Sequence, residues 1–336
     1  MPFISGVPRI ATRQPLFSAV LANTLLSTVP GISGAGPSPE KTLLTPVLDA
    51  ELITLGEITS MPVKPNTPTG CPTPASITRS MMELSGLHAL FINAGLVHRP
   101  TVPCLDAYGE PGGDPRFADA VPRAEELFGR GKAIGMFLGR VSDLLVLGEC
   151  VPGGTTTAMC VLRGLGYHAR VSSSFSENPV RMKEEVWDEV MRRLDADPGD
   201  GPLDVVRVCG DPMIALSAGI YSAYQGTLIL AGGTQMLAVA AVAKRLGLPA
   251  PRVVTTCYVR DDASANFAGL AGEIGAEAYY VDPGFGDLGH SGLARYCIGE
   301  VKEGMGAGGA MFLAALLGHS PEAIREKIFE FVRFYD

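Results

Sequence analysis

The sequence has little charge and no paired cysteines. Charged residues make up 18% of its 336 positions, and 27 Lys and Arg against 35 Asp and Glu leave a net charge of −8. This acidic balance argues against a nucleic-acid partner. The seven cysteines include no C-x-x-C pair, so neither a disulfide framework nor a zinc ribbon is indicated, and a reducing compartment is the default.

Histidine clusters and long apolar runs are also missing. The five histidines include no H-E-x-x-H motif, so we expect no metal bound by the protein. No apolar run reaches the roughly 18 residues typical of a transmembrane helix. Residues 16–29 are apolar and follow two arginines, as in a signal peptide, but polar residues interrupt them and no A-x-A site follows. We expect a soluble, cytoplasmic protein that does not bind a membrane.

Glycine, in contrast, is abundant. The chain has 41 glycines and 26 prolines without a G-X-Y period, which excludes collagen, and 46% of its residues are hydrophobic. A chain of this length buries a core without disulfides or metals. The glycine surplus therefore indicates tight turns or pockets lined by backbone.

Short apolar runs alternate with helical patterns, and glycines follow most of the runs. Helices are predicted from Pro74 to Gly86, over 123–128 and 135–141, after Gly154, and over 179–195. Strands are predicted at residues 89–92, 144–147, 205–208, 227–230, 253–258 and 278–281. This alternation predicts βαβ units and a parallel sheet. Ligands of such sheets bind outside the carboxyl ends of the strands.

The fold class that we predict is α/β: a Rossmann-like, three-layer parallel sheet with helices on both faces, plus a small helical subdomain from the terminal segments. Residues 1–75, including a proline-rich loop at 61–75, are assigned to an N-terminal segment of the small subdomain. Residues 76–316 are assigned to the α/β domain and residues 317–336 to a C-terminal helix.

The segment L-G-E-C-V-P-G-G-T-T-T, which begins at Leu147, lies between a predicted strand and a predicted helix. Free N–H groups and the positive end of the helix dipole make such a turn an anion site. The alternative is an ordinary turn capped by threonines. The segment is not a Walker loop, because no Gly-Lys-Ser/Thr follows.

The segment Gly304–Gly309 contains G-x-G-x-x-G, which is weak support for NAD binding because a dinucleotide site needs a further strand and an acidic residue. Glu300 and Glu303 precede these glycines. A carboxylate on a glycine-lined turn is a candidate general base, and the alternative is a solvated charge at a helix start.

Two further segments and one lysine carry polar groups. Residues 232–236 again have two glycines between a predicted strand and a predicted helix. The loop 282–291 is rich in Asp and includes His290. Such a loop can bind magnesium or phosphate, although spacing alone does not set the ligand geometry. Lys183 lies near the start of its predicted helix and is either a solvated charge or a phosphate partner.

Several segments resemble nicotinate-nucleotide–dimethylbenzimidazole phosphoribosyltransferases in order and spacing. L-G-E-C-V-P-G-G-T-T-T resembles their G-E-M-G-I-G-N-T-T motif, and V-R-M-K-E-E-V-W resembles the next helix, which carries a phosphate-binding lysine. P-L-D-V-V-R-V-C-G and T-L-I-L-A-G-G-T-Q-M resemble the next two βα units, and E-G-M-G-A-G-G-A resembles the terminal E-G-T-G-A-A-L-A. P-G-I-S-G-A-G-P-S-P-E near the start resembles the uncharacterised branch found in archaea and cyanobacteria.

The resemblance implies an enzyme, a glycosyltransferase of the pentosyl class. It would move phosphoribose from nicotinate mononucleotide to a benzimidazole-like azole for the lower ligand of cobalamin. The nicotinate is already a cationic leaving group, so the resemblance implies no cofactor and no metal. It also implies a homodimer. The resemblance does not decide whether the acceptor is dimethylbenzimidazole, adenine, a phenol or another compound. A non-catalytic nucleotide-binding relative and an NAD-dependent oxidoreductase are the alternatives.

The resemblance also places functional residues. Glu303 matches the general base, and Glu149 matches a second glutamate beside the base site. The phosphate site is implied at Val151, Gly153, Gly154, Thr155 and Lys183. Weaker matches to substrate-binding positions are Met82, Leu87, Cys150, Gly233, Gly304 and Gly306. The chain departs from the motif at Gly154, where the family has asparagine, and at Pro152, which has no N–H to donate.

Overall fold

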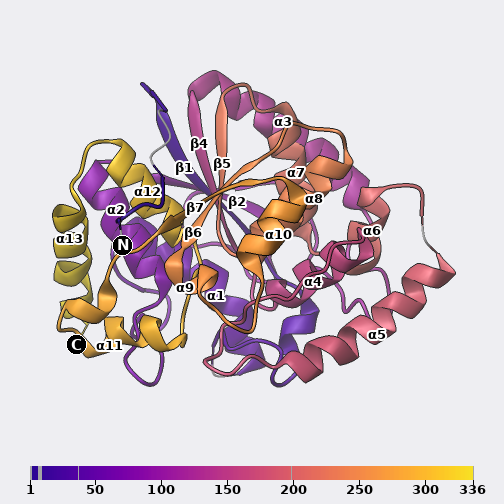
Figure 1. Ribbon diagram of the computed structural model, residues 1–336, viewed down its shortest axis with the longest axis horizontal. Helices are drawn as coiled ribbons and strands as arrows, with labels where there is room; N and C mark the ends of the chain where they lie inside the picture. The colour runs from indigo at the N-terminus through magenta and orange to yellow at the C-terminus, as the bar shows by residue number, and fades with distance from the viewer. Residues whose placement is uncertain (1, 7–9, 37, 198, 336) are drawn as a thin grey trace.

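A parallel sheet of seven strands, in the order β3-β2-β1-β4-β5-β6-β7, forms the centre of the described molecule (Figure 1). The computed structural model describes residues 2–6, 10–36, 38–197 and 199–335, so residues 1, 7–9, 37, 198 and 336 of the predicted segments lie outside it. The strands are β1 (Pro15–Ala22), β2 (Ala89–Gly95), β3 (Cys104–Asp106), β4 (Leu144–Cys150), β5 (Thr227–Ala231), β6 (Arg252–Thr256) and β7 (Glu277–Val281).

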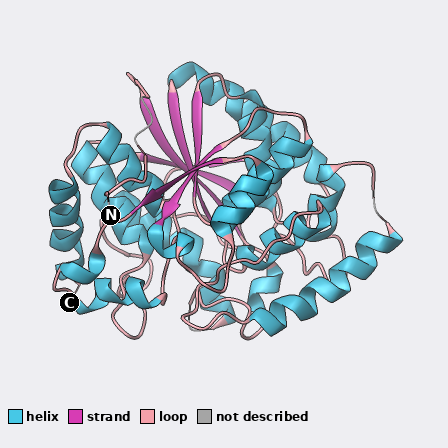
Figure 2. Cartoon of the chain, viewed as in Figure 1, coloured by secondary structure: helices cyan, strands magenta, loops and turns pink. Residues whose placement is uncertain are grey.

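Helices cover both faces of this sheet, as Figure 2 shows. One face packs on α3 (Ala124–Val141), α4 (Gly154–Gly164), α7 (Pro212–Ala223), α8 (Thr234–Arg245) and α10 (Phe267–Ile274), with α5 (Val180–Ala196) and α6 (Pro202–Cys209) outside them. The opposite face packs on α1 (Pro39–Leu55), α2 (Pro74–Ser85), α12 (Ala307–Leu316) and α13 (Pro321–Arg333). The predicted three-layer α/β class is therefore confirmed.

Side chains alternate along the central strands and divide the core in two. In β1, Val20 faces the first helical layer and Phe17 faces the second. β1 pairs with β2 on one side and β4 on the other, so that Val20 lies opposite both Ile92 and Glu149. The strand order reverses between β1 and β4, and parallel sheets bind ligands at the carboxyl ends beside such a reversal.

The predicted strand at 205–208 is wrong, because these residues belong to α6. Pro202 stands at the first position of the helix, where its missing N–H costs nothing. The Asp204 carboxylate accepts hydrogen bonds from the N–H groups of Asp200 and Gly201, at 2.9 and 3.1 Å. This start-of-helix bonding outweighs the strand preference of the three valines.

Two predicted boundaries also change. Residues 123–128 and 135–141 belong to the single helix α3. Its glycines allow contact with α7, since a Cβ at Gly131 would lie 2.2 Å from the Leu216 carbonyl oxygen. The strand expected over 253–258 ends at Thr256, and the short helix α9 (Cys257–Arg260) follows.

The N-terminal segment contributes to the sheet. β1 lies within residues 1–75, which were assigned to the small subdomain, yet it is a central strand. The division into three ranges otherwise stays a prediction. Throughout the described ranges, the helices are too short or too polar to cross a bilayer.

Candidate functional site

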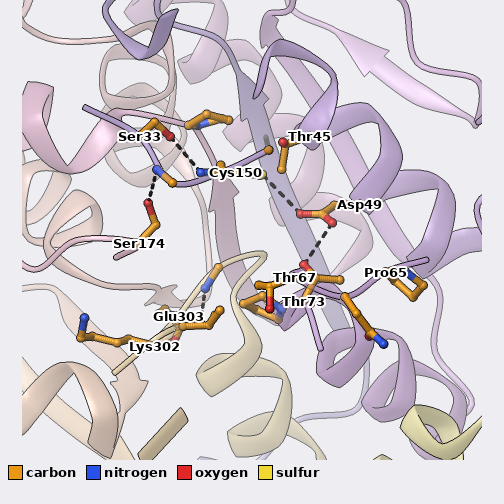
Figure 3. A pocket seen from close by; sticks show the side chains of 18 of the residues that line it. Ser33, Thr45, Asp49, Pro65, Thr67, Thr73, Cys150, Ser174, Lys302 and Glu303 are labelled. Carbon is orange, nitrogen blue, oxygen red and sulfur yellow. Dashed lines mark hydrogen bonds between the residues drawn. The ribbon is translucent and has the colours of Figure 1, made fainter. Parts of the chain in front are cut away.

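A cavity of about 1570 Å³ opens at the carboxyl ends of the strands (Figure 3). Its floor includes Glu149 and Cys150 at the end of β4, Gly233 after β5 and Glu303 before α12. Segments far apart in the sequence form the walls, namely residues 33–36, 63–68 and 172–175 and the end of α13. The sheet edge thus brings together several residues that sequence analysis singled out.

Glu303 lies half-buried at the start of α12 and lines the cavity. The Gly304 N–H donates to Oε1 at 3.1 Å, and the Gly308 N–H lies 3.3 Å from both carboxylate oxygens. A Cβ at Gly308 would lie 2.8 Å from Oε2, so glycine is needed for this approach. Burial raises the pKa of Glu303 to about 7 despite these donors. Such a group exists in both protonation states near neutral pH.

Glu149 is buried beside Glu303. The Gln235 Nε2 donates to its Oε2 at 2.6 Å. Burial first, then the nearby carboxyls of Asp211 and Glu303, raise the pKa of Glu149 to about 8. At neutral pH, Glu149 is therefore mainly uncharged.

The turn between β4 and α4 forms part of the cavity wall. Val151, Pro152, Gly153 and Thr155 line the cavity, and Gly153 has a φ of +78° as the residue before the helix. The left-handed backbone of Gly153 lets the chain turn from β4 into α4 beside the cavity, and Thr155 is the residue of the first helical turn that lines it.

Gly154 of the same turn lies under the Gln235 side chain. A Cβ at position 154 would lie 2.4 Å from Gln235 Nε2. The Gln235 amide therefore fills space beside the position where the family motif has asparagine. Gly154 acts by leaving room for this amide.

Lys183 lies behind the wall of the cavity. Its side chain is 2% exposed, and its Nζ donates to the Ser172 carbonyl at 2.6 Å. Burial, with repulsion from Lys302, lowers the pKa of Lys183 to about 7. Among the described residues, the cationic side chains that line the cavity are those of Lys41, Lys64, Lys302 and Arg333. The phosphate-binding role of Lys183 stays a prediction.

The weaker matches divide into two groups. Cys150, Gly233 and Gly304 line the cavity. Met82 is a buried core residue, and Leu87 packs against the same core. Gly306 holds α12 against the sheet, where a Cβ would lie 3.0 Å from the Gly148 Cα.

Glu300, the partner of Glu303 in the predicted carboxylate pair, has a different environment. It accepts a hydrogen bond from Thr67 Oγ1 at 2.7 Å and pairs with Arg295. These contacts tie the loop before α12 to the proline-rich loop. Glu300 is thus a structural residue of the loops.

Asp49 of α1 was missed by sequence analysis. It lines the cavity and accepts hydrogen bonds from Thr73 Oγ1 at 3.3 Å and from the Cys150 thiol at 3.8 Å, as Figure 3 shows. Burial raises its pKa to about 7. No motif marks Asp49, and the available signal was the pair of acids, Asp49 and Glu51, among the apolar residues in the second half of its helix.

Lys302 was also missed. Its ammonium donates to the carbonyls of Ser173, Phe175 and Gly299 at 2.9–3.2 Å and lies 3.4 Å from Asp262. It thereby clamps the wall segment 172–175 beside Glu303. Its place directly before the glutamate of the terminal motif was the available signal.

The loop 282–291 reaches the cavity through its end, where Gly289, His290 and Ser291 line it. In the described ranges, no three His, Cys, Asp or Glu side chains converge as a metal site would require. The Gly304–Gly309 segment runs into the first turn of α12, α13 comes next, and no described strand follows it. It therefore lacks the second half of a dinucleotide-binding unit.

The comparison with solved structures identifies the fold. The nicotinate-nucleotide–dimethylbenzimidazole phosphoribosyltransferase of Thermus thermophilus superposes with a TM-score of 0.62 at 18% identity, over 96% of this chain and 83% of that one. A structure of CobT from the same organism gives 0.62 at 17% identity, over 96% and 84%. The chain has the α/β fold of these phosphoribosyltransferases.

Sequence relatives identify the family. A UPF0284 protein of Methanosarcina mazei is 43% identical over 326 residues, which cover 94% of this chain and 93% of that protein. One from Thermococcus gammatolerans is 44% identical, over 95% and 98%. The chain belongs to the UPF0284 family. No protein-family model matches it. The predicted resemblance to the phosphoribosyltransferases and to an archaeal branch is confirmed.

Proposed function

We propose that the protein is a phosphoribosyltransferase that moves phosphoribose from nicotinate mononucleotide to an azole base of the cobamide lower ligand. The unprotonated ring nitrogen of the azole attacks C1′ of the ribose. The bond from C1′ to the nicotinate nitrogen breaks, and its electron pair stays on that nitrogen. The azole N–H proton passes to the Glu303 carboxylate.

The position of Glu303 is the observation that carries this proposal. Its carboxylate faces the cavity at the sheet edge and is held by backbone N–H groups, so its orientation is fixed before substrate binds. Its pKa of about 7 suits a general base, since catalytic efficiency is greatest when the pKa lies near the working pH. The neutral Glu149 beside it leaves room for the electron-rich azole without a second full negative charge.

The turn before α4 supports the donor half of the proposal. Its backbone and Thr155 line the same cavity as Glu303, which allows one nucleotide to span both. Pro152 removes one backbone donor, so Thr155, which lines the cavity, carries more of the phosphate contact. Positioning of this kind contributes much of the rate in transfers with a good leaving group.

The test is direct turnover. The protein is incubated with nicotinate mononucleotide and, in turn, benzimidazole, 5,6-dimethylbenzimidazole, adenine and phenol. Chromatography follows released nicotinate, and mass spectrometry identifies the new glycoside. We expect azole-dependent release. Tight nucleotide binding without release for any acceptor would favour the alternative of a non-catalytic nucleotide-binding relative.

Glu303→Gln tests the general base. A general base contributes roughly 10²–10⁴ in rate, so turnover should fall by about that factor while the affinity for nicotinate mononucleotide stays within about twofold. Glu300→Gln is the matched control, because Glu300 bonds to the loops and should retain turnover. Equal turnover in wild type and Glu303→Gln would remove Glu303 from this role.

A further inference from the structure

The first residue of helix α8 carries a buried hydroxyl that has no partner. Thr234 lines the cavity and is 1% exposed, and its Oγ1 has no hydrogen-bond partner among the described residues. A buried polar group without a partner costs free energy, and native structures nearly always satisfy such groups. A ligand oxygen in the cavity would give this hydroxyl the hydrogen-bond partner that it lacks.

The backbone around Thr234 also provides donors. α8 has 12 residues, and neither a side-chain cap nor an acidic residue occupies its first turn. The Met236 N–H donates to the Gly233 carbonyl at 3.0 Å, whereas the N–H groups of Thr234 and Gln235 have no acceptor within the helix. A Cβ at Gly233 would meet only Val259, at 3.9 Å, so space remains in front of this backbone.

The acidic neighbour of this turn does not repel an anion at neutral pH. Glu149 approaches the turn, since its Oε1 would lie 3.3 Å from a Cβ at Gly232, and Gln235 binds its other oxygen. Its pKa of about 8 leaves this carboxyl mainly protonated near pH 7. Thr234, the helix N-terminus and a neutral acid thus surround one small volume.

We propose that the first turn of α8 is a second oxyanion subsite, separate from the turn before α4, and that it holds an anionic group of the donor nucleotide. The assignment of this anionic group to a nucleotide rests on the proposed function. β4 and β5 are neighbours in the sheet, so the starts of α4 and α8 lie side by side. Two adjacent oxyanion subsites match a donor with two anionic groups, the 5′-phosphate and the nicotinate carboxylate.

The test is a binding measurement with Thr234→Val, which removes the hydroxyl and keeps the shape. Calorimetry measures the dissociation constants of nicotinate mononucleotide, nicotinamide mononucleotide, nicotinate and inorganic phosphate, without an acceptor. Loss of a hydrogen bond to a charged group weakens binding about tenfold, and we expect this for nicotinate mononucleotide. Thr234→Ser should restore the wild-type value.

Thr156→Val is the matched control. Thr156 lies in the first turn of α4, is fully buried and also has an unpartnered Oγ1, but it does not line the cavity. This variant should bind every ligand as wild type does. Thermal melting checks that both valine variants fold.

The ligands distinguish the two sources of the anion. If the subsite holds the carboxylate, Thr234→Val weakens nicotinate and its mononucleotide but leaves the nicotinamide compound unchanged. If it holds the phosphate, both mononucleotides and inorganic phosphate weaken together. Binding by Thr234→Val that equals Thr156→Val for all four ligands overturns the proposal, as does a wild-type protein that binds none of them. Absence of turnover with every azole contradicts the proposed function and leaves this binding test intact.

Discussion

Gly154 and Gln235 show how a single missing side chain shapes the site. The amide of Gln235 occupies the space next to Gly154 and holds Glu149 by a bond of 2.6 Å. A methyl group at position 154 would meet chiefly the end of the Gln235 side chain, which can move, and would lie 3.0 Å from the Val151 Cβ. The effect of such a change should therefore appear in function before it appears in folding.

Gly154→Ala should have the same effect as a substitution of Gln235. Displacing the amide leaves the buried Glu149 carboxyl without this donor, and a buried group that loses its hydrogen-bond partner costs about 1–3 kcal/mol, which is about tenfold at the lower end. We expect turnover to fall about tenfold in Gly154→Ala and in Gln235→Ala, and no further in the double variant, because both changes break the same contact. The double-mutant cycle is measured by nicotinate release.

Gly129→Ala is the control for this cycle. A Cβ there would meet nothing within 4 Å, so turnover should be unchanged. Additive losses in the double variant would show that Gly154 and Gln235 act separately.

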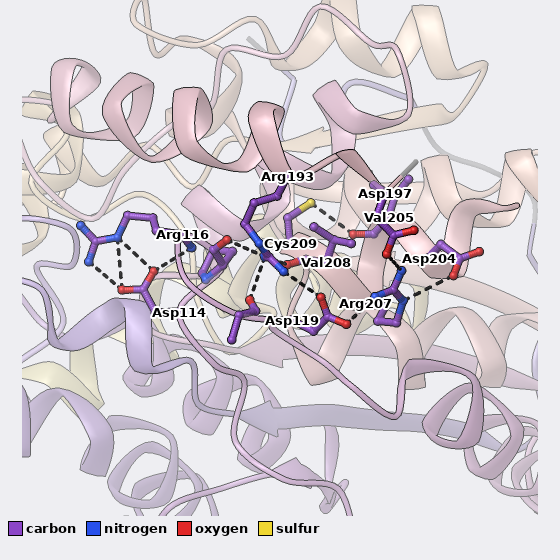
Figure 4. Close-up of polar contacts among 12 residues, drawn as sticks. Asp114, Arg116, Asp119, Arg193, Asp197, Asp204, Val205, Arg207, Val208 and Cys209 are labelled. Atoms are coloured by element: carbon purple, nitrogen blue, oxygen red, sulfur yellow. Dashed lines mark hydrogen bonds and ion pairs between the residues drawn. The ribbon is translucent and has the colours of Figure 1, made fainter. Parts of the chain in front are cut away.

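At the scale of elements, an ion-pair network joins α5, α6 and the loop before α3 (Figure 4). Arg193 donates to the carbonyls of Pro115, Ala118 and Val208 at 2.7–3.2 Å and pairs with Asp119 at 2.8 Å. Asp119 also binds Arg207. One guanidinium thus satisfies three backbone carbonyls where α5, α6 and the loop before α3 meet.

Arg193→Ala should destabilise the protein by about 2 kcal/mol, because partly buried carbonyls lose their donor. Urea unfolding measures this change. Arg192→Ala is the matched control, since the Arg192 side chain is 65% exposed and pairs with Glu189. A surface pair of that kind contributes less than about 1 kcal/mol. Equal losses in both variants would contradict the structural role of Arg193.

Elements were predictable where a local pattern decides them. β2, β4, β5 and β7 are apolar runs that end near glycine or turn residues, and they fall where the sequence predicts them. β1 was not recognised, because a strand buried on both faces has no alternating pattern and its run continues into a 3₁₀ helix. At α6, the hydrogen bonds at the helix start outweigh the preference of its valines for a strand.

The site residues, like the elements, were predictable where a local sequence pattern marks them. Glu149, Gly153 and Glu303 could be predicted because they belong to motifs at strand ends and helix starts. Asp49 could not be predicted, since it reaches the cavity through the tertiary packing of α1. The burial of Lys183 had a local signal: with Val186 and Val190 it forms the buried stripe of α5.

At the scale of the whole molecule, buried carboxyl groups link stability to pH. Burial raises the pKa to about 7 for Asp49 and Glu303, about 8 for Glu149 and about 6 for Asp211. Each group holds its proton more tightly when the chain is folded. Its contribution to stability is therefore full below the unfolded pKa of about 4 and is lost as the pH rises through the folded value.

The free energy of unfolding should thus fall between about pH 5 and pH 7. Asp49→Asn removes one of these groups and should make the fall shallower. Urea unfolding at both pH values tests this. Lys183 adds the opposite slope only above its lowered pKa of about 7, so it does not mask the effect. A rise in stability over this window would contradict the assignment.

The central position of β1 has a consequence for synthesis on the ribosome. Translation makes β1 before both of its neighbours, and β4 is not complete until residue 150. Until then, the nascent chain carries an apolar strand with open hydrogen-bonding edges, which is a site for aggregation or chaperone binding. Ribosome-stalled chains that end before β4 should bind a chaperone, and chains that extend past α8 should release it.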